Sequence, residues 1–194
     1  MEEPAADYRM EGMIEKTRHA LIAWDETPFH IELSALERNF LFKTLIDTSP
    51  RNIVEWGSGG STILFAENKF PATTFISIEH NKIWYDKLKD IVAPISGVAY
   101  RFIAPSGPFT AYGTIEEEDS TYLQDYIHAP ADISDVDLFF VDGVVRISIL
   151  ERIAREAKPG SYILVHDTYR TWYDKALALF SPVTKVDSLT FVVK

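Results

Sequence analysis

The chain has 194 residues, of which 46% are hydrophobic and 25% charged, a balance that fits one compact domain with a sizeable core. Its formal net charge of -10 argues against a nucleic-acid partner, because such binding draws affinity from lysine and arginine side chains at the phosphates. The absence of cysteine excludes disulfides, thiolate zinc sites and cysteine nucleophiles.

The first 33 residues are interpreted as an N-terminal extension of the single domain, with an amphipathic helix predicted from Met10 to Ala23. Neither a signal peptide nor an apolar run of membrane-spanning length is evident. We therefore expect a cytoplasmic protein that does not bind a membrane. Next, Ser34-Ala-Leu-Glu37 matches a capping box and predicts a helix from Ser34 to about Ile46.

From Asn52 onward, short apolar runs alternate with helical patterns. The runs predict strands at Asn52–Trp56, Thr73–Ile78, Val98–Ile103, Asp137–Val141 and Tyr162–Val165. Helices are predicted between them at Ser61–Asn68, Asn81–Val92, with Trp84, Leu88 and Ile91 on one face, and Arg146–Ala157. Such alternation, with right-handed crossovers, gives an α/β, doubly wound, mostly parallel sheet.

Two further features complete the predicted organisation. The segment 105–135 interrupts the alternation after the third strand, and a loop of this length in a compact domain is usually functional, so we expect it to lie over the substrate side. A last helix is predicted from Tyr169 to Phe180, with Trp172, Ala176, Leu179 and Phe180 facing inward. The runs Val183–Val186 and Leu189–Val193 then flank Asp187-Ser188 and predict an antiparallel hairpin.

The segment Ile53–Thr62 has the pattern of a strand, a glycine turn and the start of a helix. Glycine lets the backbone turn sharply and brings its N–H groups close to a ligand, although such turns also serve close packing alone. Glu55 and Glu79 end the first two strands, so both are expected to point into one crevice. A carboxylate after the second strand can accept both ribose hydroxyls, whereas a surface glutamate capping a helix is the plainer interpretation of Glu79.

Glu55 also bears on which nucleotide the loop would bind. A pyrophosphate at the helix N-terminus would be repelled by an acid inside the turn, and a dinucleotide loop would want Gly or Ala in place of Thr62. S-adenosylmethionine instead carries an ammonium and a sulfonium, which a nearby carboxylate favours.

These residues resemble the first two motifs of the class I S-adenosylmethionine-dependent methyltransferases, and the resemblance extends to the closing hairpin of a seven-stranded, Rossmann-like sheet. It implies S-adenosylmethionine as cofactor, held by Glu55, Gly57, Ser58, Gly59, Gly60 and Ser61 around the methionine part, by Glu79 at the ribose and by His80 near the adenine. The sequence departs from the family after the third strand, where Ala104-Pro105-Ser106 lacks the usual acid. Backbone groups or Ser106 are the expected substitutes.

Polar residues also follow the fourth and fifth strands. Because the ends of parallel strands converge on one rim, Asp142, His166 and Asp167 are the predicted catalytic residues. Their spacing resembles that of the catechol and caffeoyl-CoA O-methyltransferases, whose aspartates bind a divalent metal, but Thr168 stands where that family has Asn. We therefore do not favour a metal. His166 or Asp142 would then act as general base, unless His166 is a core histidine bonded to an aspartate.

Arg146 is expected either to pair with Asp142 or to bind an acidic acceptor. The leading hypothesis is an enzyme that methylates an oxygen or nitrogen of a small acidic or phenolic molecule, and it is compatible with a homodimer. The alternatives are a methyltransferase-like protein that binds S-adenosylmethionine without catalysis, and a nucleotide-binding oxidoreductase, which Glu55 and Thr62 disfavour.

Overall fold

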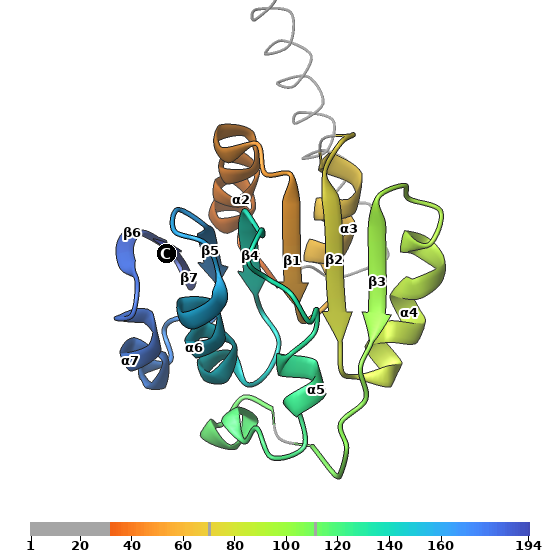
Figure 1. The fold of residues 1–194 in the computed structure, drawn as a ribbon, viewed down its shortest axis with the longest axis vertical. Helices are drawn as coiled ribbons and strands as arrows, with labels where there is room; N and C mark the ends of the chain where they lie inside the picture. Colours follow the sequence, from red (N-terminus) through yellow and green to blue (C-terminus); the bar gives the residue numbers. More distant parts are fainter. Residues whose placement is uncertain (1–31, 70, 111) are drawn as a thin grey trace, which may run out of the picture.

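The computed structural model describes residues 32–69, 71–110 and 112–194, and its described strands form one seven-stranded sheet in the order β3-β2-β1-β4-β5-β7-β6 (Figure 1). The strands are β1 (Asn52–Trp56), β2 (Thr74–Glu79), β3 (Val98–Phe102), β4 (Leu138–Val141), β5 (Tyr162–Val165), β6 (Ser181–Val186) and β7 (Leu189–Val193). β1 to β5 pair in parallel, and β7 lies antiparallel between β5 and β6. The predicted mostly parallel sheet and its closing hairpin are confirmed.

Helices cover both faces of this sheet, and as a result the central strands β1 and β4 are buried on both sides (Figure 1). They are α2 (Ala35–Thr48), α3 (Gly60–Asn68), α4 (Lys82–Val92), η2 (Ile115–Glu118), α5 (Gln124–Ile127), α6 (Arg146–Glu156), η3 (Thr171–Tyr173) and α7 (Asp174–Leu177). Along β1 the side chains alternate between two cores: Val54 joins one with Leu150 of α6, and Ile53 joins the other with Leu41 of α2 and Leu64 of α3. The doubly wound architecture is therefore confirmed.

Local signals define the α2 helix well. The Ser34 hydroxyl accepts a hydrogen bond from the Glu37 N–H, and the Glu37 carboxylate accepts one from the Ser34 N–H, which is the predicted capping box. The predicted helix from Met10 to Ala23 lies outside the described residues. None of the helices in the described ranges combines the length and apolar character that a membrane span needs.

The predicted helix from Tyr169 to Phe180 is wrong in its extent. The chain forms the short η3 turn and one turn of α7 instead, and Leu179 is 53% exposed rather than inward-facing. The η3 turn directs Tyr173 inward, where its hydroxyl donates to Glu117. The contact of Tyr173 with Glu117 thus accompanies an interrupted helix in place of the predicted continuous one.

Trp84 is likewise not buried as the spacing with Leu88 implies. Leu88 is fully buried in α4, whereas Trp84 is 40% exposed and lies at the mouth of a cavity. The part of the long segment that contains η2 and α5, residues 105–110 and 112–127, lies beyond the ends to which β1, β2 and β3 point (Figure 1). Its Tyr112, Gly113 and Glu117 line that same cavity.

Candidate functional site

Two strand-end loops meet with their backbones in direct contact at Gly57 and Gly143. Gly57 has a φ of 89°, and a Cβ atom there would lie 2.4 Å from the Gly143 nitrogen. Only glycine combines this left-handed conformation with so close an approach. The loop after β1 is therefore fixed against the loop after β4, and Gly59, where a Cβ would meet nothing within 4 Å, faces open space.

Glu55 lies beneath the loop that follows β1, and it lines neither of the two cavities at the strand ends. Its carboxylate is fully buried and accepts hydrogen bonds from the hydroxyls of Ser61 at 2.7 Å, Thr62 at 2.7 Å and Ser77 at 2.5 Å. Burial raises the pKa of Glu55 to about 7, against the lowering effect of these hydroxyls. Contrary to the expectation that both strand-end glutamates point into one crevice, Glu55 fastens the start of α3 to β1 and β2.

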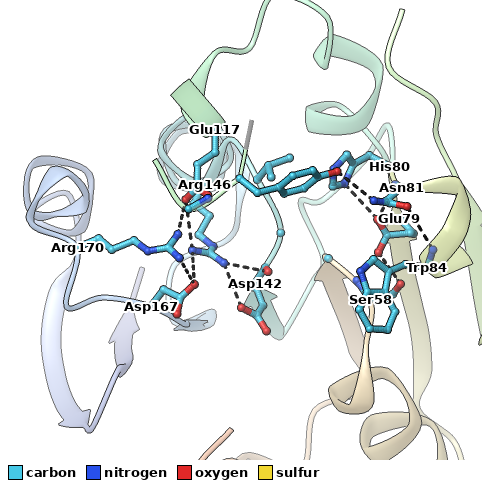
Figure 2. Close-up of a pocket in the computed structure, with 15 residues that line it drawn as sticks. Ser58, Glu79, His80, Asn81, Trp84, Glu117, Asp142, Arg146, Asp167 and Arg170 are labelled. Atoms are coloured by element: carbon cyan, nitrogen blue, oxygen red, sulfur yellow. Dashed lines mark hydrogen bonds and ion pairs between the residues drawn. The ribbon is translucent and has the colours of Figure 1, made fainter. Parts of the chain in front are cut away.

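Glu79, at the end of β2, does face a cavity. Its Oε2 accepts bonds from the Ser58 N–H at 2.8 Å and the Ser58 hydroxyl at 2.6 Å, and its Oε1 accepts from the Asn81 N–H at 2.7 Å (Figure 2). Burial alone would raise its pKa, but the contacts with His80, Ser58 and Asn81 outweigh burial and lower it. The Glu79 carboxylate is therefore a buried, ionised hydrogen-bond acceptor beside Ser58 of the loop that follows β1.

The remaining predicted site residues line two adjoining cavities, of about 240 and 620 Å³. The smaller is lined by residues that include Gly57, Ser58, Glu79, His80, Asn81, Tyr112, Asp142 and Asp167. The larger is lined by residues that include Leu33, Ser58, Gly59, Gly60, Ser61, Asp142, His166, Asp167 and Ser188. The two share Ser58, Trp84, Asp142, Arg146, Asp167 and Arg170. The strand ends of β1, β2, β4 and β5 thus lie around two neighbouring cavities with shared walls.

His166 lies between carboxylates from two parts of the chain. Its Nδ1 is 2.9 Å from Asp142 Oδ1, and its Nε2 is 3.7 Å from Glu37 Oε2 on α2. Burial by itself would lower its pKa, but Asp142, Asp167 and Glu37 outweigh burial and raise it. Both interpretations of His166 thus share one geometry: a buried histidine bonded to Asp142, on the wall of the larger cavity.

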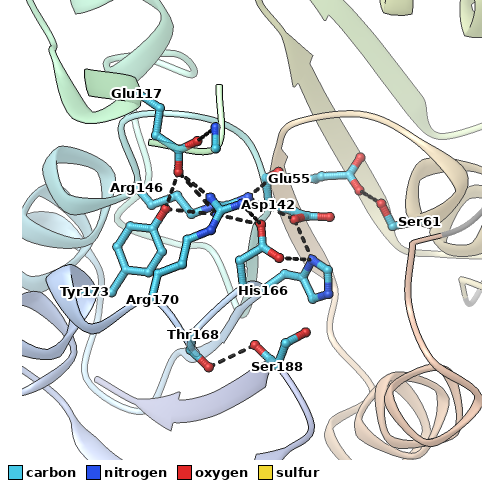
Figure 3. A network of polar contacts seen from close by, with 12 residues as sticks. Glu55, Ser61, Glu117, Asp142, Arg146, His166, Thr168, Arg170, Tyr173 and Ser188 are labelled. Carbon is cyan, nitrogen blue, oxygen red and sulfur yellow. Dashed lines mark hydrogen bonds and ion pairs between the residues drawn. The ribbon is translucent and has the colours of Figure 1, made fainter. Parts of the chain in front are cut away.

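Arg146 is the centre of the polar network in Figure 3. It donates to Asp142 Oδ1 at 3.2 Å, to Asp167 Oδ2 at 3.1 Å and to the Tyr173 hydroxyl at 3.0 Å. Val145 precedes it with a φ of 51°, a costly conformation for a β-branched residue, and this turn starts α6 with Arg146 directed back toward the strand ends. The expected pairing with Asp142 is confirmed, and it includes Asp167.

The residues at these strand ends do not fit a divalent metal. One ligand atom from each of Asp142, His166 and Asp167 lies within 4.8 Å of the others, which would suit an ion by spacing alone. The Arg146 guanidinium, however, already contacts both aspartates. Thr168, where the metal-binding pattern has Asn, points its hydroxyl to the Ser188 carbonyl at 2.9 Å.

Three residues of the network were not predicted as site residues from the sequence. Arg170 lies 3.1 Å from Asp167 and 2.5 Å from Glu117, and Glu117 also accepts from the Tyr173 hydroxyl at 2.6 Å. The acidic run at 116–119 in the long loop was the available signal, but its partners lie far along the chain. Ser106, an expected substitute for the missing acid, is exposed and lines neither cavity.

No protein-family model matches the sequence, and no curated protein matches it either. Solved structures do match. A methyltransferase-like protein from Silicibacter pomeroyi has a TM-score of 0.65 at 19% identity, over 85% of this chain and 88% of its own. An O-methyltransferase from Bacillus cereus in complex with SAH has a TM-score of 0.59 at 16% identity, over 94% and 91%.

An RNA methyltransferase from Salinibacter ruber, in complex with S-adenosyl-L-homocysteine, also matches, with a TM-score of 0.51 at 12% identity over 84% of this chain and 92% of its own. The chain has the class I methyltransferase fold. Within this methyltransferase fold, the antiparallel β7 between β5 and β6 is the feature that the sequence resemblance anticipated. Because these matches include both an O-methyltransferase and an RNA methyltransferase, the fold does not identify the acceptor, which has to be argued from the site.

Proposed function

We propose that this chain binds S-adenosylmethionine in the two adjoining cavities and transfers its methyl group to an oxygen or nitrogen of a small-molecule acceptor. The observation that supports this most is that residues 57–61, Glu79 and Asp142 line two neighbouring cavities at the strand ends of a methyltransferase fold. When bound, S-adenosylmethionine supplies an electrophilic methyl group on a sulfonium.

Glu79 is the proposed ribose ligand. Ser58 now occupies Oε2 of Glu79 with both its N–H and its hydroxyl. The Ser58 hydroxyl also lies 2.7 Å from the Tyr100 hydroxyl, so it keeps a partner when it turns away from Glu79. A ribose hydroxyl can then take its place at Oε2 without leaving a buried polar group unpaired.

The amino-acid end is assigned to the larger cavity, where Gly59, Gly60 and Ser61 start α3. A helix start presents unpaired N–H groups that suit a carboxylate. Glu55 acts indirectly in this proposal, by holding the Ser61 and Thr62 hydroxyls from below the loop.

Asp142 is the proposed proton acceptor for the incoming nucleophile. Among the described residues, the contacts to its side chain from Arg146 and His166 both end on Oδ1, and Asp142 lines both cavities. Its Oδ2 therefore suits an acceptor hydroxyl or amine. His166 is less suited to take a proton because its pKa is raised, so that more of it is protonated near neutral pH than of a free histidine.

A small acceptor follows from charge and space. The net charge of -10 opposes a nucleic acid, and the larger cavity has about 620 Å³. The exposed aromatic rings of Trp84 and Tyr169 line that cavity and would pack against a planar acceptor. A homodimer stays a prediction from the sequence.

Calorimetry with S-adenosylhomocysteine and with NADH tests the proposal. We expect the first to bind and the second not to. Glu79→Gln should weaken S-adenosylhomocysteine about ten- to hundredfold, because a hydrogen bond to a charged group is worth about 1.5–3 kcal/mol. The control is Glu67→Gln on the exposed side of α3. Binding of NADH alone, or equal affinity in the Glu79→Gln variant, would overturn the assignment.

A further inference from the structure

The Arg146 guanidinium contacts both strand-end aspartates, Asp142 and Asp167, whose ligand atoms are spaced with His166 as a metal ion would require. We propose that its guanidinium is the built-in cation of this site, so that the site excludes Mg²⁺ and Mn²⁺ and orients the acceptor without chelating it. The consequence for the acceptor rests on the proposed function, whereas the exclusion of metal ions does not.

The first support is the geometry of the pairing. The two terminal nitrogens of Arg146 divide between the aspartates: Nη2 lies 3.2 Å from Asp142 Oδ1, and Nη1 lies 3.1 Å from Asp167 Oδ2. Nη2 also donates to the Asp142 carbonyl at 3.0 Å. One planar cation thus bridges β4 and β5 through three bonds, and a guanidinium cannot lose its proton in a protein.

The second support is that Arg146 is fixed from behind. It is only 4% exposed, it donates to the Tyr173 hydroxyl at 3.0 Å, and Glu117 Oε1 lies 3.9 Å from its Nη1. A buried guanidinium with these partners cannot swing into water without breaking its hydrogen bonds to Asp142, Asp167 and Tyr173. A metal ion entering between the aspartates would stay beside a fixed positive charge.

The third support is the state of the remaining ligand positions. Asp167 is paired a second time, by Arg170 at 3.1 Å, and the His166 Nδ1 faces Asp142 at 2.9 Å. Thr168, which is 2% exposed, points its hydroxyl to the Ser188 carbonyl at 2.9 Å (Figure 3). The same hydroxyl lies 2.6 Å from the Thr190 hydroxyl. One oxygen of each aspartate, Asp142 Oδ1 and Asp167 Oδ2, is therefore paired with arginine, and a hard cation at the remaining oxygens would lie beside these guanidinium groups.

This arrangement narrows the acceptor. A divalent ion with open coordination positions can bind two oxygens of one acceptor, whereas a guanidinium that is already shared by two aspartates offers no such positions. The acceptor is then held by hydrogen bonds to single groups such as Asp142. We infer that a molecule with one nucleophilic hydroxyl or amine serves as acceptor, with no requirement for a vicinal diol.

Electron paramagnetic resonance of Mn²⁺ tests the exclusion directly, because protein-bound and free Mn²⁺ give different signals. We expect the wild-type chain to leave millimolar Mn²⁺ free. The double variant Arg146→Met/Arg170→Met removes both guanidinium groups from the aspartates and should gain Mn²⁺ binding. Arg146→Lys in the wild-type background keeps a charge at the site and should remain without Mn²⁺.

Three results would overturn the proposal. Wild-type chain that binds Mn²⁺, with loss of binding in Asp142→Asn, means that the aspartates form a metal site despite Arg146. A folded double variant that binds no Mn²⁺ means that the guanidinium does not stand in a cation position, and thermal melting checks that it is folded. Mn²⁺ binding by Arg146→Lys means that charge does not exclude the ion.

S-adenosylhomocysteine calorimetry on the same wild-type sample separates this proposal from the proposed function. If the wild-type chain binds neither S-adenosylhomocysteine nor Mn²⁺, the methyltransferase assignment is wrong, but the proposal that Arg146 is the cation of the site still stands. If the wild-type chain binds both S-adenosylhomocysteine and Mn²⁺, only the proposal about Arg146 is wrong.

Discussion

Glu55 gives the chain a dependence of stability on pH that one substitution should remove. Its pKa is about 7 in the folded chain, against 4.5 for an ordinary glutamate, mainly because the carboxyl is fully buried. A carboxyl with a raised pKa keeps its proton in the folded chain at pH values where the unfolded chain has already released it. The free energy of unfolding therefore falls as the pH rises through this interval.

The magnitude follows from the shift. A difference of roughly 2.5 pKa units corresponds to about 3 kcal/mol in total, of which about 2 kcal/mol is lost between about pH 5.5 and pH 8. His166 adds a loss in the same direction, since its raised pKa contributes stability below about 6.5 that disappears as the pH rises through the folded value. Only a comparison of variants isolates the contribution of Glu55.

Urea unfolding followed by circular dichroism at a series of pH values measures the effect. Glu55→Gln cannot ionise, so its curve should gain about 2 kcal/mol relative to wild type between about pH 5.5 and pH 8. Glu67→Gln, at an exposed position of the same α3 helix, should follow wild type. A constant difference between Glu55→Gln and wild type over this range would refute the assignment of the raised pKa to Glu55.

Three other predictions concern neighbouring residues. Gly57→Ala places a Cβ 2.4 Å from backbone in a left-handed conformation and should cost at least about 2 kcal/mol in urea unfolding, whereas Gly59→Ala, in open space, should cost under about 0.5 kcal/mol; equal costs would contradict the loop geometry. Asp142→Asn should lower the pKa of His166 in an NMR titration, because Asp142 helps to raise it, and an unchanged value would contradict the pairing. Tyr126→Phe removes a buried hydroxyl that has no partner among the described residues, so the melting temperature should hold or rise; a clear fall would reveal a partner.

Parallel strand ends are what made the site predictable from the sequence. Asp142 and His166 were placed on one rim because β4 and β5 run in the same direction, and their side chains lie 2.9 Å apart. The same reasoning predicts Glu79 at the cavity. Each of these predictions needs only the strand periodicity and the direction of the crossovers, both of which are local properties of the chain.

Long-range packing is what the sequence leaves open. Glu117 and Arg170 are 53 residues apart, and their contact depends on how the long segment after β3 folds over α6. Trp84 shows a related limit, since helical spacing groups it with Leu88 but does not tell which edge of the buried face ends at a cavity. Periodicity predicts that a side chain belongs to a face, whereas the neighbouring segments decide whether that face is covered.

Glu55 shows how the role predicted for a residue from its charge can differ from the contacts that the residue makes. From the sequence, the negative charge of Glu55 is expected to repel a pyrophosphate and to attract an ammonium across the loop. In the structure the carboxylate faces the hydroxyls of Ser61, Thr62 and Ser77, and with a pKa of about 7 it is only partly charged near neutral pH. Under the proposed function, any influence of Glu55 on the cofactor would therefore be indirect, through the hydroxyls of Ser61 and Thr62 that it holds at the start of α3. In the proposed function, direct discrimination between cofactors then falls to Glu79, whose lowered pKa favours a negative charge beside the smaller cavity, which would accept the hydroxyls of a ribose and repel a phosphate on that ribose.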